Sequence, residues 1–211
     1  MDCPLCGNRG PIKIIEGPDD RIFRFCDHCY SIFIDPVFRP EYQEEKERYL
    51  THKNGIEFPG YVRFLNRAIK PALPYLKEGA GGLDFGCGPK PTLSVILKNK
   101  GFKCDNYDPI FYQNGMNSKC YDFIFATECF EHFFNPSDEL DFLCNLMKRG
   151  SLLVIMTDFY QSLKAFRTWH YVNDQTHVIF FHRQTIAFIA EKWRFTILPS
   201  KDDRVVIFRK T

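Results

Sequence analysis

The 211-residue chain lacks a strong charge of either sign and any apolar run long enough to cross a bilayer. Its 28 Lys and Arg residues nearly balance 26 Asp and Glu residues, and the formal net charge is +2. A membrane span needs about 20 consecutive apolar residues, and a secretory signal needs a basic stretch before an apolar one. We therefore expect a cytoplasmic protein with no membrane partner, and the charge gives no support for nucleic acid as a partner.

The chain also lacks internal repeats and low-complexity segments. The residues are 45% hydrophobic and 16% aromatic, as in an ordinary globular protein. The pattern of cysteine, charged and apolar residues changes twice along the chain. We expect a small cysteine-anchored module at residues 1–36, a helical lead-in at residues 37–78, and one α/β domain at residues 79–211.

Strand-like and helix-like segments alternate in the third part, which predicts a parallel sheet with crossover helices. The last two strands are so close in sequence that they must pair antiparallel. We expect strands near residues 82–85, 103–107, 121–126, 151–156, 195–198 and 205–209, and helices at residues 92–100, 136–146 and 183–193.

Nine cysteines are an odd number, which argues against a framework of disulfides. Cys3 with Cys6 and Cys26 with Cys29 form two C-x2-C pairs separated by about the length of a hairpin. Four thiolates complete a tetrahedral Zn²⁺ shell with no open position, so this spacing predicts a structural zinc site in a small ribbon. The alternative is four buried or redox-active thiols.

A glycine-rich turn follows the first strand of the α/β domain. Gly86, Cys87 and Gly88 come directly after an apolar stretch, and glycines let a ligand approach the backbone closely. The dinucleotide fingerprint G-x-G-x-x-G would need glycine at position 91, where this chain has Pro91. A nicotinamide dinucleotide is therefore disfavoured.

The sequence from Leu83 to Gly88, with Asp84 in the strand, resembles the first motif of class I S-adenosylmethionine-dependent methyltransferases. Asp108 ends the next strand, where that family has an acidic residue that binds the ribose hydroxyls. The stretch from Tyr121 to His132 is similar to the family's fourth strand and the turn after it. The N-terminal ribbon and helical lead-in resemble a subgroup of bacterial methyltransferases.

This resemblance implies a Rossmann-like fold with a seven-stranded, mostly parallel sheet and helices on both faces. It implies S-adenosylmethionine as cofactor. One departure is Lys90, which stands where the family commonly has glycine and which could narrow the cofactor pocket. Asp84 and Asp108 could each also be turn-forming ends of strands. The cofactor-binding residues that the resemblance implies are Asp84, Gly86, Cys87, Gly88, Asp108, Pro109, Thr127 and Glu128.

Two histidines are candidates for the catalytic residues. His132 follows the fourth strand, at the sheet edge where the methyl group should point, and we expect it to act as a base if the acceptor must lose a proton. His177 lies in the segment 169–178, which is rich in polar and aromatic residues and suits the wall of an acceptor pocket. Each histidine could instead make only structural hydrogen bonds.

The leading interpretation is therefore an enzyme that methylates a small molecule, whose identity and methylated atom the sequence does not specify. One alternative is an RNA methyltransferase that grips RNA with its ribbon, and a protein acceptor also stays open. Another alternative is a non-catalytic protein in which the ribbon binds a partner and the cofactor domain is vestigial. The oligomeric state cannot be read from the sequence.

Overall fold

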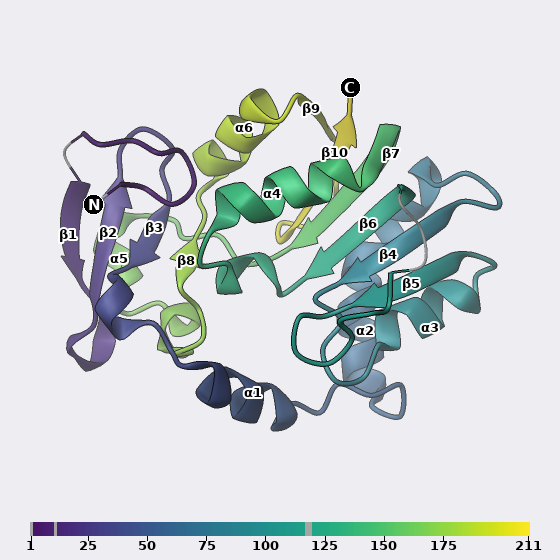
Figure 1. The fold of residues 1–211 in the computed structure, drawn as a ribbon, viewed down its shortest axis with the longest axis horizontal. Coiled ribbons are helices and arrows are strands. Elements are labelled where there is room, and N and C mark those ends of the chain that lie inside the picture. Colours follow the sequence, from purple (N-terminus) through teal and green to yellow (C-terminus); the bar gives the residue numbers. More distant parts are fainter. Residues whose placement is uncertain (1, 11, 117–119) are drawn as a thin grey trace.

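The computed structural model describes residues 2–10, 12–116 and 120–211, in which the strands form two sheets (Figure 1). The central sheet has the order β5-β4-β6-β7-β10-β9. Its first four strands are parallel, and β10 runs antiparallel to both β7 and β9. The strands are β4 (Gly81–Phe85), β5 (Lys103–Tyr107), β6 (Tyr121–Thr127), β7 (Met147–Met156), β9 (Phe195–Leu198) and β10 (Val205–Lys210).

Helices cover both faces of this sheet, as predicted. Successive residues of a strand point to opposite faces, so Phe123 packs with α2 (Pro59–Ala72) and α3 (Thr92–Lys98), whereas Ile124 packs with α4 (Pro136–Asn145) and α6 (Arg183–Lys192). The helix α2 contains Pro71 and ends one residue later, where the 3₁₀ turn Leu73–Tyr75 begins.

The expected number of seven strands is wrong, because the central sheet has six among the described residues. The edge strand is β5. Only residues 108–120 separate it from β6, and this segment is too short for a crossover connection and a further parallel strand, since a crossover alone takes a dozen or more residues. Its described part forms turns and one isolated bridge between Asp108 and Tyr112.

The second sheet has the order β1-β2-β3-β8, and it joins the N-terminus to a distant segment. The strands β1 (Ile12–Glu16), β2 (Ile22–Cys26) and β3 (Ile32–Ile34) form an antiparallel meander. The hairpin of β1 and β2 fits the spacing of the two cysteine pairs, whereas β3 was not predicted. The strand β8 (Ile179–Phe180), which comes from the C-terminal half and pairs with β3, was not predicted either.

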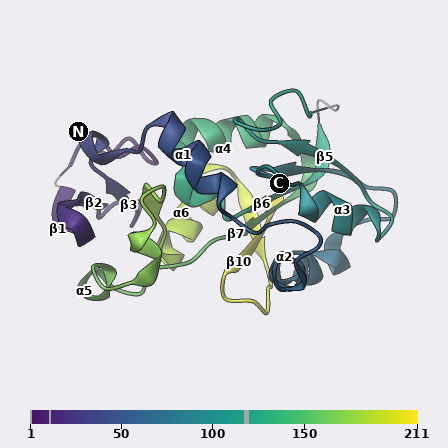
Figure 2. The same cartoon turned by 90° about the horizontal axis from the view of Figure 1, so that it is seen from below.

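Two helices lie outside the central layers. The helix α1 (Tyr42–Leu50) lies between the N-terminal strands and α2 in both ribbon views (Figures 1 and 2). The short helix α5 (Leu163–Phe166) packs its Phe166 against Phe23 of β2. None of the helices in the described part of the chain is long and apolar enough to cross a membrane.

Candidate functional site

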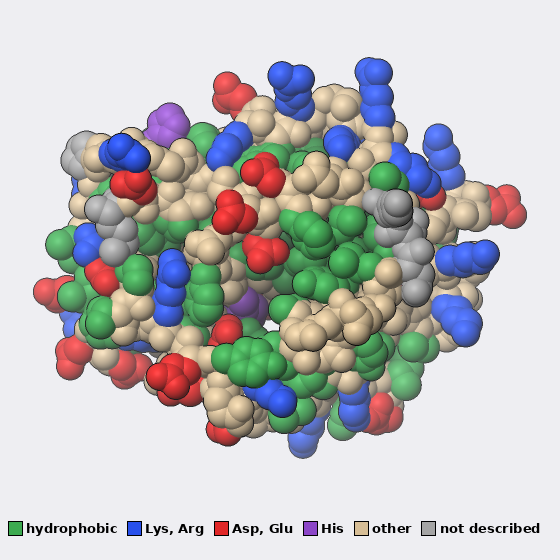
Figure 3. All heavy atoms as spheres, in the orientation of Figure 1, with side chains coloured by type: hydrophobic (Ala, Val, Ile, Leu, Met, Phe, Trp, Pro, Cys, Tyr) green, Lys and Arg blue, Asp and Glu red, His purple; other side chains and the backbone are tan. Residues whose placement is uncertain are grey.

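A cavity of about 700 Å³ opens at the carboxyl ends of β4, β5 and β6, which is the edge where open α/β sheets bind ligands. The space-filling view shows the hollow in the middle of one face, with a histidine at its rim (Figure 3). Nine of the ten predicted cofactor and catalytic residues line it: Gly86, Cys87, Gly88, Asp108, Pro109, Thr127, Glu128, His132 and His177.

The glycine turn has a conformation that requires glycine. Gly86 and Gly88 have φ angles of +73° and +66°, a region that side chains other than glycine rarely adopt. A Cβ at Gly86 would lie 2.4 Å from the sulfur of Cys129. The N–H groups of Gly86 and Cys87 both donate to the carbonyl of Tyr107, at 2.8 and 3.1 Å. These bonds hold the turn against the end of β5.

Asp108 is buried, and it joins the glycine turn to the next loop. Its Oδ2 accepts a hydrogen bond from Gly88 N at 2.9 Å, and its Oδ1 accepts from Ile110 N and Phe111 N at 2.8 and 3.0 Å. A carboxylate has about four acceptor positions. Three of them are occupied, so Oδ2 can accept one more hydrogen bond from a ligand.

Asp84 is the predicted residue that does not line the cavity. It is 2% exposed and lies beneath the turn, where a backbone hydrogen bond from Ser94 ties it to the first turn of α3. Burial raises its pKa to about 7. Its place is that of a support for the glycine turn, and a direct contact with a cofactor stays a prediction.

Lys90 is not among the residues that line the cavity. Its ammonium pairs with Glu57 Oε1 at 2.6 Å on the surface and lies 5.8 Å from the ring centre of Phe58. The side chain therefore does not narrow the cavity in this structure. It ties the glycine loop to the segment between α1 and α2.

The two candidate histidines lie together at the other end of the cavity. The Nδ1 of His132 lies 2.8 Å from the carbonyl oxygen of Thr176, and the Nδ1 of His177 lies 2.8 Å from that of Tyr171. A carbonyl can only accept, so each Nδ1 carries the proton and the lone pair of the neutral ring lies on Nε2. Burial lowers the pKa of both rings, that of His177 to about 3.

Behind the histidines lies a buried polar network. Glu131 accepts hydrogen bonds from the hydroxyls of Tyr171 and Thr157, and the same Tyr171 hydroxyl lies 3.2 Å from Glu128. Arg204 donates to both oxygens of Glu128 at 2.8 Å. Burial raises the pKa of Glu128 to about 8 and that of Glu131 to about 7. Glu128 also has a φ of +49°, a strained conformation of the kind that clusters at functional sites.

Glu131, His132 and His177 also bring potential metal-ligand atoms within 4.8 Å of one another. However, each carboxylate oxygen of Glu131 already accepts a hydrogen bond from a hydroxyl. The two rings are 4.9 Å apart between their centres, and burial lowers the pKa of each. Glu131 is thus already engaged within the protein, and a proton-transfer role for His132 stays a prediction.

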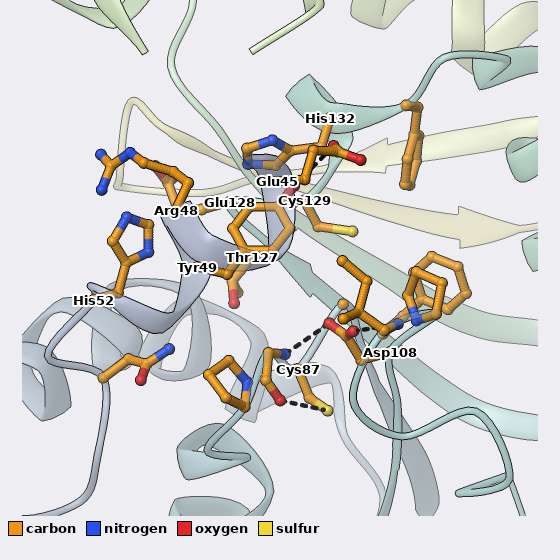
Figure 4. A pocket seen from close by; sticks show the side chains of 18 of the residues that line it. Glu45, Arg48, Tyr49, His52, Cys87, Asp108, Thr127, Glu128, Cys129 and His132 are labelled. Carbon is orange, nitrogen blue, oxygen red and sulfur yellow. Dashed lines mark hydrogen bonds between the residues drawn. The ribbon is translucent and has the colours of Figure 1, made fainter. Parts of the chain in front are cut away.

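The helix α1 supplies a third wall that the sequence did not indicate. The ring of Tyr49 packs edge-on against His132 at 5.3 Å, and its hydroxyl donates to Glu45 at 3.2 Å. Arg48 pairs with Asp174 at 2.7 Å. Figure 4 shows these α1 side chains on the same side of the cavity as His132, opposite Cys87 and Asp108. No local sequence motif indicates these residues, because the residues that they contact are far away in sequence.

The four predicted metal ligands form one cluster in the N-terminal ribbon. Their sulfur atoms lie within 4.8 Å of one another, with Cys3 and Cys29 at 3.5 Å and Cys6 and Cys26 at 3.6 Å. Sulfurs at the corners of a tetrahedral zinc site with bonds of about 2.3 Å are about 3.8 Å apart. The donor set and its spacing therefore fit such an ion.

Comparison with known proteins gives a family and a fold. The family model of the methyltransferase domain matches residues 57–199, and no curated protein matches the sequence. A methyltransferase from Aquifex aeolicus described as SAM-dependent is 16% identical, with a TM-score of 0.57 over 79% of this chain and 98% of that one. The PH0226 protein of Pyrococcus horikoshii is 12% identical, with a TM-score of 0.52 over 78% and 99%. At these identities the likeness shows a common fold.

Proposed function

Because the chain belongs to the methyltransferase family whose model covers residues 57–199, we propose that it transfers a methyl group from S-adenosylmethionine to a small-molecule acceptor. One observation carries this proposal. The glycine turn, Asp108, His132 and His177 all line the same cavity of about 700 Å³. Its volume lies in the range of small-molecule sites, roughly 300–1,000 Å³.

The end of the cavity near β4 suits the cofactor, which supplies an activated methyl group when bound. The two glycines leave room for a ligand against the backbone. The free acceptor position on Oδ2 of Asp108 suits a ribose hydroxyl. Thus Asp108 would bind one hydroxyl and at the same time keep Gly88 in place.

The opposite end suits an acceptor that loses a proton as it is methylated. The Nε2 of His132 has a lone pair, and the hydrogen bond from Nδ1 to Thr176 fixes the ring. We propose His132 as the base. His177 would form part of the wall, because its hydrogen bond to Tyr171 and its low pKa keep it neutral.

We further propose that Cys3, Cys6, Cys26 and Cys29 bind a structural zinc ion. The closed set of four thiolates supports this assignment, because it leaves no position for a substrate. The ion would stabilise a ribbon that is too small to fold by burial alone.

The test is calorimetric titration of the protein with S-adenosylmethionine. We expect saturable binding, and we expect Asp108→Ala to weaken it by ~1.5–3 kcal/mol because a hydrogen bond to a charged group is lost. Asp203→Ala is the matched control, since Asp203 is 88% exposed and lies outside the cavity. No saturable heat from the native protein would refute the cofactor. Unchanged affinity in Asp108→Ala would refute the position of the ribose.

A further inference from the structure

The segment between α1 and α2 lies against the glycine turn. Asn54, in this segment, is 9% exposed and lines the cavity. Its backbone carbonyl accepts a hydrogen bond of 2.7 Å from the hydroxyl of Thr92, at the start of α3. Its side-chain Nδ2 lies 3.4 Å from the place where a Cβ of Gly88 would be. The Asn54 side chain thus faces the turn at close range.

The side chain of Asn54 is incompletely bonded. Its Oδ1 is buried and has no hydrogen-bond partner among the described residues. Buried polar atoms in native proteins are seldom left unpaired, and each one calls for an explanation. Rotation of a terminal amide is soft, so the carboxamide can offer either its oxygen or its nitrogen to a molecule in the cavity.

The glycine turn itself has little to offer to a charged ligand. The N–H groups of Gly86 and Cys87 donate to Tyr107, and the N–H of Gly88 donates to Asp108. The next residue is Pro89, which has no N–H. The backbone from residue 86 to residue 89 therefore has no free donor for a carboxylate, and a polar group at this end must come from another segment.

We propose that Asn54 binds the amino-acid end of the cofactor. A carboxamide has one acceptor and two donors, and the amino-acid end of S-adenosylmethionine has an ammonium and a carboxylate. The side chain can therefore pair with both. This inference rests on the proposed function, and it assigns to the lead-in segment a contact that the glycine turn cannot make.

Two ligands separate this contact from the rest of the site. S-adenosylhomocysteine has the amino-acid end, and 5′-methylthioadenosine has the same adenosine and thioether without it. We expect Asn54→Ala to weaken the binding of S-adenosylhomocysteine by about 5–20-fold, because hydrogen bonds to charged groups are lost. The binding of methylthioadenosine should weaken by less than about twofold. Calorimetric titration measures both. Asn54→Leu, which keeps the volume without the polar atoms, must reproduce the result.

Two control variants test for indirect effects. Lys90→Met breaks the ion pair with Glu57 and leaves the carboxamide intact, so both affinities should stay within about twofold of the native values. Asn66→Ala removes an amide that donates to the carbonyl of Val62 within α2, and it should change neither affinity. An equal loss of affinity for both ligands in Asn54→Ala, or no loss for either, would overturn this inference and leave the proposed cofactor unaffected. If the native protein binds neither ligand, the proposed cofactor fails and the inference fails with it.

Discussion

The two ends of the cavity are assembled in different ways. At the end near β4, the contacts are local, and Gly88 bonds to Asp108 only 20 residues further on. At the end near His132, the contacts span the chain, and Arg48 pairs with Asp174 across 126 residues. A local motif can be recognised from sequence, whereas a wall made of distant segments becomes visible only after folding. This difference explains why the motif residues of the first end were predicted and the second end was predicted only in part.

The distant end also depends on the cysteine-rich ribbon. The N–H of Ile34 in β3 donates to the carbonyl of Val178, and the N–H of Val178 donates to the carbonyl of Glu131, both at 2.8 Å. Glu131 is the neighbour of His132. Two backbone hydrogen bonds thus join the ribbon to the neighbour of the proposed base.

The largest expected effect comes from removing the proposed zinc ion. Structural zinc contributes about 10–16 kcal/mol in small zinc-binding peptides, so chelation or Cys26→Ser should unfold the ribbon and expose the amides of β3 and β8. Affinity for S-adenosylhomocysteine should change far less. Hydrogen exchange and calorimetry measure the two effects, with Cys144→Ser, outside the cluster, as the control. A large loss of cofactor affinity together with the loss of ribbon structure would show that the two ends of the cavity depend equally on the ribbon.

A second variant acts on the distant end alone. His132→Ala should lower turnover by ~10²–10⁴-fold, with little change in cofactor affinity, because only the transition state uses the proton transfer. Burial lowers the pKa of His132, so native activity should fall as the pH drops through a value below the ordinary ~6.5. The exposed His170 provides the control His170→Ala. An acidic limb that survives in His132→Ala would identify another base.

The smallest effect concerns stability. The folded-state pKa of His177 is about 3, below an unfolded value of ~6.5, so protons favour the unfolded chain and stability is lost as the pH falls from ~6.5 towards 3. Between pH 7 and pH 5 this loss is about 2 kcal/mol. The variant His177→Asn retains a hydrogen-bond donor for the carbonyl of Tyr171. Its free energy of unfolding, measured with denaturant, should fall by about 2 kcal/mol less than that of the native protein between pH 7 and pH 5. Identical pH dependence in the two proteins would contradict a buried, neutral His177.

Sequence alone was sufficient where neighbouring residues decide the structure. The alternating segments predicted the parallel sheet, and the C-x2-C spacing predicted the cysteine cluster. The pairing of β3 with β8 could not be predicted, because two residues of strand carry no periodicity and their partner lies in another part of the chain. Lys90 was expected near the cofactor, and it instead pairs with Glu57, a residue that no motif places beside it.

The same limit applies to the walls of the cavity. Tyr49 and Asn54 belong to a lead-in segment whose sequence indicates only helices and a connection. Their importance comes from packing against His132 and Gly88. Similarly, Asp108 was expected to bind the ribose or to form a turn at the strand end, and its hydrogen bond from Gly88 N was not foreseeable from that position.

The central claim is methyl transfer to a small molecule, and the most direct test is transfer of a labelled methyl group. The protein is incubated with S-adenosylmethionine labelled in its methyl group and with a cell extract separated into small molecules, RNA and protein. We expect the label to enter the small-molecule fraction and to stay out of it with His132→Ala. Label in RNA or protein alone, or no transfer by a protein that binds the cofactor, would contradict the account.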